Sequence, residues 1–371
     1  MVTNRPLKDQ DLGENDGEED FAFPPAERRV ITQPLDLSVQ TLLEQWTTKQ
    51  LVLPDIQREY VWDYAKASRL IESLLLNIPI PVLYFAETDE AKYEIFDGHQ
   101  RVRSIVNYLG GVYPLSGLAV LREYRGLRYL ELPDREQRFL RMRTLRTILI
   151  SIDSHPNMKF EIYERLNTGS ISLNAQELRN SIYRGPFNDL LHELANIPTF
   201  RTLMGTKTPR KRMVDEEAIL RFFAMRENLG TYRTPLKKFL NEFMSSARSA
   251  DAKQIEAYRN TFVQTIDTAT ALLGQSAFRV LGPNGQPSET AVNRALLEAQ
   301  LLACSWVVNQ ALPNANAVKR SVAALFQDET FTDAVRRATG DRSRTLKRAR
   351  DTVAAIEYAG AQMRVLHNLQ N

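Results

Sequence analysis

The apolar pattern of this chain changes character near Pro186. Before that residue, short runs of strand type alternate with segments whose apolar residues recur at helical spacing, and after it the spacing is almost wholly helical. The 371 residues leave room for two domains of roughly 150 residues each. We therefore predict an α+β domain over residues 29–185 and an all-helical domain over residues 186–371.

The expected elements follow from apolar spacing, N-cap residues, and Gly or Pro stops. In the first domain, strands are expected at 51–54, 82–85, 93–96 and 147–152, and helices directly after Ser38 and Asp63, at 100–109 and 159–166, and from Asn174. In the second domain, helices are expected at 187–195, 215–228, 235–247, 253–273, 289–310, 316–326 and 343–368, with breaks at Pro198, Gly230, Gly282-Pro283 and Pro313.

The N-terminal segment is acidic. Residues 8–20 are dense in Asp, Glu and Gly, with almost no apolar side chain. Such a segment buries too little surface to offset its ordering entropy. We predict that residues 1–28 form a disordered acidic tail, solvated rather than folded over a basic groove.

Composition excludes several classes of protein. The single Cys304 rules out an intrachain disulfide and a multi-cysteine zinc site, and the four histidines make no paired metal-ligand spacing. The N-terminal residues do not show the basic-then-apolar pattern of a signal peptide, and no stretch approaches the ~20 apolar residues of a membrane-spanning helix. We expect a cytoplasmic protein without a membrane partner. Because the net charge is only +3, nucleic-acid binding would need a local basic patch.

Two segments could supply such a patch. They are a loop with Lys207, Arg210, Lys211 and Arg212, and a basic run with Arg344, Lys347 and Arg348. Either could contact DNA phosphates, and either could be a solvated face.

The stretch Tyr93–Arg101 carries the candidate site. Its aromatic and β-branched residues predict a strand, Asp97-Gly98 predicts a turn, and a helix can follow from Gln100. A glycine turn at a helix start presents backbone N–H groups and the positive end of the helix dipole, which favours a phosphate. Arg101 adds a permanent positive charge. The alternative is an ordinary strand–turn–helix with a solvated Arg101.

Two further positions have candidate roles. Asn167 precedes Gly169 at an expected helix end and could reach a ligand. Asn174 and Glu177 have the spacing of a capping box, and we favour that structural role over a ligand contact.

These motifs occur together in a recognisable order. The order is Gln57-Arg58-x-Tyr60-x-Trp62, Ile78-Pro79-Ile80-Pro81, Asp97-Gly98-His99-Gln100-Arg101, Glu164-Arg165-Leu166-Asn167-Thr168-Gly169 and Gln176-Glu177-x-Arg179-Asn180. The combination resembles the N-terminal domain of GmrSD-type restriction proteins, which are bacterial proteins of modified-DNA restriction and phage defence.

The resemblance implies a ParB/sulfiredoxin-like core and NTP hydrolysis through an Asp-Gly-Gln-Gln-Arg signature. That signature falls on Asp97 to Arg101, and His99 stands in place of its first Gln. This departure counts against NTP hydrolysis but not against phosphate binding. Arg58 and Arg101 would clamp phosphate oxygens, and Asp97 would hold Mg²⁺ or orient the attacking water. The catalytic candidates are Asp97, His99 and Gln100, and the nucleotide-binding candidates are Gln57, Arg58, Gly98, Arg101 and Asn167.

The expected function is that of an NTP-binding and NTP-hydrolysing subunit, a phosphoric anhydride hydrolase, of a DNA restriction or phage-defence system. Many relatives carry an HNH nuclease, whereas only His367 lies near this C-terminus, so we expect DNA as a partner and a separate nuclease or effector. The alternative is a non-hydrolytic ParB-like DNA-binding or regulatory module. A sulfiredoxin-like redox role is disfavoured because Cys304 lies in the helical part.

Overall fold

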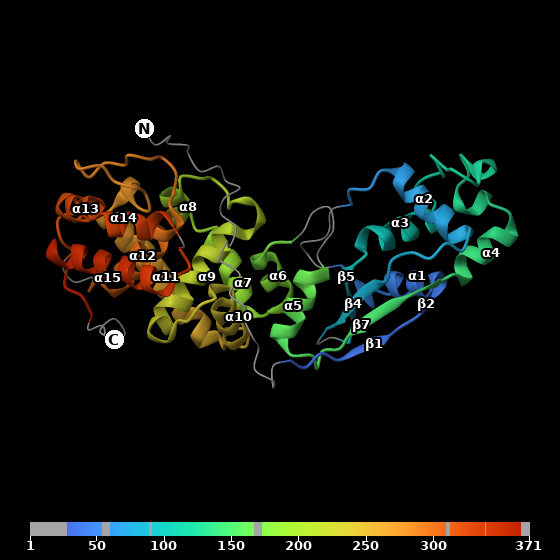
Figure 1. The fold of residues 1–371 in the computed structure, drawn as a ribbon, viewed down its shortest axis with the longest axis horizontal. Helices are drawn as coiled ribbons and strands as arrows, with labels where there is room; N and C mark the ends of the chain where they lie inside the picture. Colours follow the sequence, from blue (N-terminus) through green and yellow to red (C-terminus); the bar gives the residue numbers. More distant parts are fainter. Residues whose placement is uncertain are drawn as a thin grey trace. The chain divides into compact units, whose positions relative to one another are not determined.

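The computed structural model describes residues 28–53, 60–88, 91–166, 173–308, 312–337 and 339–364 (Figure 1). It divides between Leu173 and Asn174 into a sheet unit and a helical unit. The predicted boundary at residues 185 and 186 differs from this division only in the placement of α6 (Ala175–Ile182). The predicted acidic tail lies outside the described residues.

The sheet unit is built on a five-stranded mixed sheet with the order β1-β7-β4-β5-β3. Its strands are β1 (Thr32–Pro34), β3 (Leu51–Val52), β4 (Leu83–Glu87), β5 (Tyr93–Asp97) and β7 (Thr147–Ile150). β7 runs parallel to β4 and β5 runs parallel to β3, while the β1–β7 and β4–β5 pairs are antiparallel. A two-stranded sheet pairs β2 (Leu37–Ser38) with β6 (Thr144–Leu145).

Five α-helices and two short 3₁₀ turns are described in this unit: α1 (Val39–Thr47), α2 (Tyr64–Leu75), α3 (His99–Leu109), η4 (Arg122–Tyr124), η5 (Tyr129–Glu131), α4 (Asp134–Met142) and α5 (Pro156–Leu166). The predicted N-caps are confirmed: the Ser38 hydroxyl accepts from the Thr41 N–H at 3.0 Å, and the Asp63 carboxylate accepts from the Lys66 N–H at 2.7 Å. Such caps satisfy backbone donors that the helix itself leaves open.

The core explains why β5 and α3 are held so firmly. Ile95 of β5 and Val102 and Ile105 of α3 are fully buried in the main apolar cluster, as the helical spacing predicts. Phe96, on the opposite side of β5, packs against Tyr163 of α5, with the ring planes tilted by 40°. The turn between β5 and α3 is therefore anchored on both faces of the sheet.

The helical unit contains the predicted helices with shifted ends, plus two that the sequence analysis missed. Its α-helices are α6, α7 (Pro186–Ala195), α8 (Pro198–Met204), α9 (Val214–Asn228), α10 (Leu236–Ala247), α11 (Ala252–Leu272), α12 (Arg294–Trp306), α13 (Ala315–Ala324), α14 (Glu329–Arg336) and α15 (Arg342–Tyr358), and its 3₁₀ turns are η6 (Lys211–Met213), η7 (Leu229–Thr231), η8 (Gly274–Ser276) and η9 (Leu325–Gln327). The break expected at Pro198 is confirmed, because α7 ends at Ala195, and Pro198 itself begins α8, where the first helical position needs no N–H donor.

The capping box that opens α6 is confirmed. Asn174 accepts from the Glu177 N–H and Glu177 accepts from the Asn174 N–H, both at 2.8 Å. The structure is thus α+β followed by helices, as predicted. Among the described residues, no helix has the length and apolar character needed to cross a membrane.

Candidate functional site

The turn between β5 and α3 depends on Gly98. This residue has φ +96°, in the left-handed region, and a Cβ at this position would overlap the Leu83 side chain. An L-residue would meet both backbone strain and a steric clash there. The turn predicted at Asp97-Gly98 is confirmed, and its geometry requires glycine.

The N-terminus of α3 has no side-chain cap. Gly98, as N-cap, has no side chain to accept from the first N–H groups, and the first turn carries no acidic residue. Helix N-termini combine free N–H donors with a partial positive charge. These features are compatible with an anion, and phosphate binding at this turn stays a prediction.

Arg101 turns inward rather than standing free beside the turn. Its Nη2 donates to Asp97 Oδ2 at 2.7 Å and to the Val82 carbonyl at 3.3 Å, and its Nη1 donates to the Pro81 carbonyl. The side chain of Arg101 is 11% exposed, whereas that of Asp97 is 40% exposed. The guanidinium thus fixes the end of β5 against the segment entering β4, and its clamping of a phosphate stays a prediction.

His99 and Gln100 form the first turn of α3. The pKa of His99 is lowered, chiefly by burial, with Asp97 opposing the shift and Arg103 and Arg101 adding to it, so the imidazole is neutral at pH 7. Its Nε2 lies 2.8 Å from Gln100 Nε2. Gln100 Oε1 accepts from the N–H groups of Val61 and Trp62 at 3.1 and 3.3 Å.

Gln100 therefore anchors the segment that precedes α2. Tyr60 strengthens this anchor, because its hydroxyl lies 3.0 Å from Ser104 Oγ and the Arg103 guanidinium lies over its ring. This segment directly follows Gln57 and Arg58 in the chain. Gln57, Arg58 and Asn167 themselves lie outside the described residues.

The predicted magnesium ligand is Asp97. The described part of the chain holds no group of three or more His, Cys, Asp or Glu side chains arranged for a metal. Within that part, Asp97 uses Oδ2 for Arg101 and leaves Oδ1 without a hydrogen bond. One carboxylate oxygen suits Mg²⁺ when waters and phosphate oxygens complete the shell. The described residues therefore fit a Mg²⁺ ion that is held by one carboxylate oxygen, waters and phosphate oxygens. They do not fit a Mg²⁺ ion whose ligands all come from the protein.

The basic loop at residues 207–212 is partly neutralised. Arg210 pairs with the buried Asp215 at 2.7 Å, and Arg212 pairs with Glu177 at 2.9 Å. Lys207 and Lys211 are exposed and form no ion pair with the described residues. Only the two lysines keep an uncompensated charge for a phosphate.

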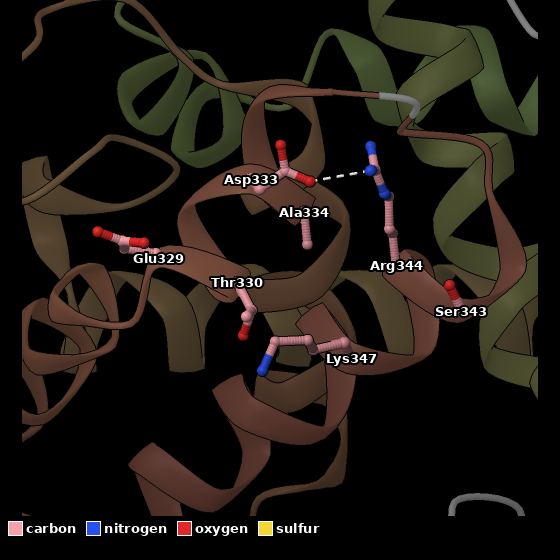
Figure 2. A pocket seen from close by; sticks show the side chains of 7 residues that line it. All are labelled: Glu329, Thr330, Asp333, Ala334, Ser343, Arg344 and Lys347. Carbon is pink, nitrogen blue, oxygen red and sulfur yellow. Dashed lines mark ion pairs between the residues drawn. The ribbon is translucent and has the colours of Figure 1, made fainter.

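The second basic run is neutralised more completely. Figure 2 shows Arg344 and Lys347 at a hollow of about 460 Å³ between α14 and α15. Arg344 pairs with Asp333 at 2.8 Å, and Lys347 pairs with Asp328 and Asp351 at 3.0 and 2.8 Å. Because carboxylates balance both cations, this hollow has no surplus charge to attract an anion.

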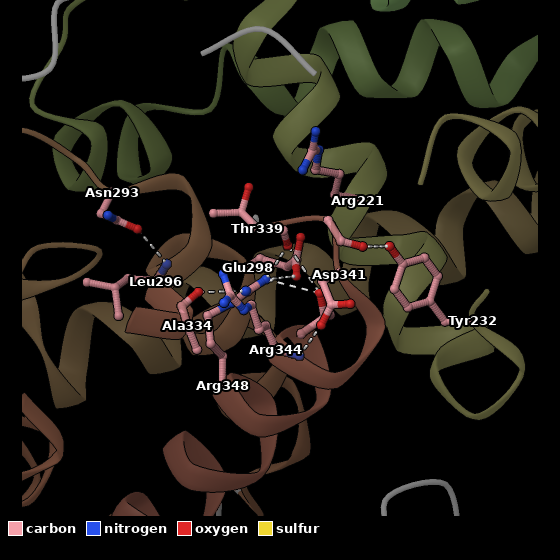
Figure 3. A network of polar contacts seen from close by, with 12 residues as sticks. Arg221, Tyr232, Asn293, Leu296, Glu298, Ala334, Thr339, Asp341, Arg344 and Arg348 are labelled. Carbon is pink, nitrogen blue, oxygen red and sulfur yellow. Dashed lines mark hydrogen bonds and ion pairs between the residues drawn. The ribbon is translucent and has the colours of Figure 1, made fainter. Parts of the chain in front are cut away.

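Arg348 corrects one prediction. It was a candidate for DNA contact, but it is fully buried and pairs with Glu298 at 3.2 Å (Figure 3). It also donates to the carbonyls of Ala334 and Thr339 at 3.0 and 2.8 Å. A side chain without exposed surface cannot reach a phosphate backbone, so Arg348 joins α12, α14 and α15 instead.

A different basic segment was missed by the sequence analysis. Residues 118–143, which we call the arginine lobe, contain seven arginines, no lysine and four carboxylates. The surplus of three positive charges equals the net charge of the whole chain. The excess of arginine over lysine and carboxylates is visible in the sequence of this segment. Because no helix was expected at α4, no function was predicted for it.

Comparisons with known proteins agree with the resemblance. Residues 39–184 match the family model described as the GmrSD restriction endonuclease, N-terminal domain. The match covers β5, α3 and the turn between them, together with the arginine lobe. Searches of curated proteins and of solved structures found no match.

Proposed function

We propose that this chain, whose residues 39–184 match the GmrSD N-terminal domain model, is a component of a bacterial DNA restriction or phage-defence system that binds a nucleoside triphosphate and hydrolyses it. The proposed binding site is the β5–α3 turn, in a ParB/sulfiredoxin-like core. The observation that carries the proposal is the glycine-capped N-terminus of α3, which lacks a side-chain cap and an acidic first turn.

Asp97 is the proposed catalytic carboxylate. The side chain is 40% exposed, and its oxygen Oδ1, which is not paired with Arg101, can hold a Mg²⁺ ion together with phosphate oxygens or orient the attacking water. A bound Mg²⁺ would neutralise charge on the transferred phosphoryl group. Arg101 fixes the rotamer of Asp97 through the 2.7 Å ion pair, and so acts as a positioning residue.

His99 and Gln100 complete the described part of the proposed site. The neutral imidazole of His99 can donate or accept a hydrogen bond, depending on its tautomer. Gln100 links the turn to the Tyr60–Trp62 segment. Arg58, two residues before Tyr60 in the sequence, remains a proposed phosphate ligand. Gln57 and Asn167 are proposed to contact base or ribose.

A second candidate function is a nucleotide-dependent DNA-binding switch without hydrolysis. The ion pair between Arg101 and Asp97 favours this second function. In that pair the two charged side chains of the signature bind each other, and not a phosphate or a Mg²⁺ ion. In that case the turn would bind phosphate through backbone N–H groups alone.

Calorimetric titration with ATP, GTP and CTP in the presence of Mg²⁺ tests nucleotide binding, and phosphate release tests hydrolysis. We expect binding by the wild-type protein, and at least about a hundredfold loss of turnover in Asp97→Asn. Asp153→Asn, an exposed carboxylate in the same unit, is the matched control and should keep full turnover. Failure of all three nucleotides to bind would overturn the proposal, whereas binding without turnover would select the switch.

We further propose that a separate nuclease or effector subunit cuts DNA. Incubation of the purified chain with plasmid DNA and divalent metal should leave the plasmid intact. Robust cleavage that persists through further purification would contradict this assignment.

A further inference from the structure

The arginine lobe carries six exposed arginines: Arg122, Arg125, Arg128, Arg135, Arg138 and Arg141. Within the described chain, none of the six forms an ion pair with a carboxylate. Their contacts are with neutral groups, such as the Ala119 carbonyl for Arg122 and the Phe139 ring for Arg135. The lobe therefore keeps a surplus of three positive charges over its own four carboxylates, and neutral contacts hold most of its exposed guanidinium groups in place.

The lobe is anchored before any partner arrives. The buried Glu72 of α2 accepts from three consecutive N–H groups, those of Ala119, Val120 and Leu121, at 3.1, 2.7 and 2.8 Å. Burial raises the pKa of Glu72, but these three donors outweigh it and the net pKa is lowered, so the carboxylate stays charged. A surface fixed in this way loses little conformational entropy on binding.

Helix α4 presents its arginines in a row. Arg135, Arg138 and Arg141 recur every third residue, so they span about 9 Å along the helix axis. Figure 1 shows α4 beside α2 in the sheet unit. Arg141 lies over the Tyr129 ring, with 5.4 Å between the guanidinium carbon and the ring centroid, which ties the row to η5. A row of guanidinium groups, two of which are held against aromatic rings, suits the regularly spaced phosphates of a nucleic-acid backbone.

The lobe lies at the far end of α3 from Gly98. Arg128 donates to the carbonyl of Gly111, just beyond the C-terminus of this helix. The 11 residues of α3 span about 16 Å, so the lobe and the turn are separate surfaces. Binding at the lobe does not require the proposed nucleotide site.

We propose that the arginine lobe binds duplex DNA through its phosphate backbone, without sequence preference. Arginine without lysine favours this partner, because the guanidinium fork matches phosphate oxygens in two-point contacts. Leu130 and Met142, which are 77% and 75% exposed, lie among the arginines. An acidic protein or an anionic membrane could also cover such a surface, and the test below separates these partners from DNA.

Fluorescence anisotropy of a labelled mixed-sequence duplex, titrated with nucleotide-free protein at several NaCl concentrations, tests the proposal. The variant Arg135→Ala/Arg138→Ala/Arg141→Ala should raise the Kd for DNA at least about tenfold. The slope of log Kd against log[NaCl] should fall by about two to three, because up to three phosphate contacts are lost. The variant with lysine at the same three positions should retain most of the affinity, because it keeps the charge.

The matched control is Lys207→Ala/Lys211→Ala, which removes exposed unpaired cations from the helical unit. Its Kd for DNA should stay within about twofold of wild type. Alanine is a strong helix former, so α4 should persist, and circular dichroism checks this. If the α4 variant fails to fold, Arg122→Ala/Arg125→Ala/Arg128→Ala replaces it with the same expected loss.

Unchanged DNA affinity in the folded lobe variants would overturn the proposal. So would wild-type binding to phosphatidylserine vesicles, or to an acidic polypeptide, without binding to DNA. Calorimetry with the nucleotide should give the same affinity for the lobe variants and wild type. A failed DNA result is therefore distinguishable from a failed nucleotide site.

Discussion

The arginines of the helical unit and those of the arginine lobe are equally cationic but face different surroundings. In the helical unit, Arg210 faces Asp215, Arg344 faces Asp333 and Arg348 faces Glu298. In the lobe, the six exposed arginines face carbonyls, aromatic rings or solvent, and no carboxylate among the described residues. The first set contributes to folding, whereas the second keeps charge available for a partner.

The difference teaches that a basic run in a sequence does not by itself indicate a basic surface. The neutralising carboxylates can be remote in the chain: Glu177 is 35 residues from Arg212, and Glu298 is 50 residues from Arg348. Only the fold brings such pairs together.

Arg348→Met should lower the free energy of unfolding of the helical unit by about 3–5 kcal/mol, because Glu298 would be left buried without its partner. Urea denaturation monitored by circular dichroism measures this. The double variant Arg348→Met/Glu298→Leu should recover much of the loss. The exposed Arg337→Ala is the control and should change stability by less than about 0.5 kcal/mol.

Gly98→Ala should destabilise the sheet unit by about 1–3 kcal/mol through its positive φ, and further through the overlap with Leu83. Nucleotide binding should be lost while DNA binding at the lobe persists, because the two lie at opposite ends of α3. Gly111→Ala, with φ +71° and no atom near its added Cβ, is the control for backbone strain alone. Equal losses of stability in both variants would contradict the steric argument.

Acid should weaken the helical unit through Asp215. Burial raises the pKa of this carboxyl, but Arg210 and Arg201 outweigh it, so the net pKa lies below the ordinary value of 3.8. A lowered pKa in the fold adds stability above pH 3.8, and this stability is lost as the pH falls through the lowered value. Wild type should therefore be more stable than Asp215→Asn at neutral pH, and the difference should shrink on acidification. A difference that grew towards low pH would reverse the assigned sign.

Lys207→Ala/Lys211→Ala should have the smallest effect. Because both lysines are exposed and unpaired within the described chain, we expect stability to change by less than about 0.5 kcal/mol. Thermal unfolding measures this directly. A large loss of stability would show that the loop depends on contacts of these lysines, and would weaken the contrast between the two basic surfaces.

Local chemistry explains which parts of the fold were predictable. The caps at Ser38 and Asp63, the buried stripe of α3 and the need for Gly98 all depend on neighbours within a few residues, so the sequence indicates them. The short edge strand β1 was missed because its three residues carry too little pattern.

The orientation of the candidate site could not be predicted in the same way. Arg101 was expected to face a ligand, but its guanidinium is directed at Asp97 and at the Pro81 and Val82 carbonyls, about twenty residues away in the chain. Arg348 was missed as a core residue because burial of a charge depends on a partner in another helix. Such pairings are tertiary properties, which apolar spacing does not encode.

Photocrosslinking of a bromouracil-substituted duplex to the wild-type protein, followed by peptide mass spectrometry, tests most directly whether the unpaired arginines form the DNA surface. The account predicts crosslinked peptides within residues 118–143. Crosslinks confined to residues 207–212 or 336–350 would contradict it, because they would place DNA on the basic segments whose arginines are already paired.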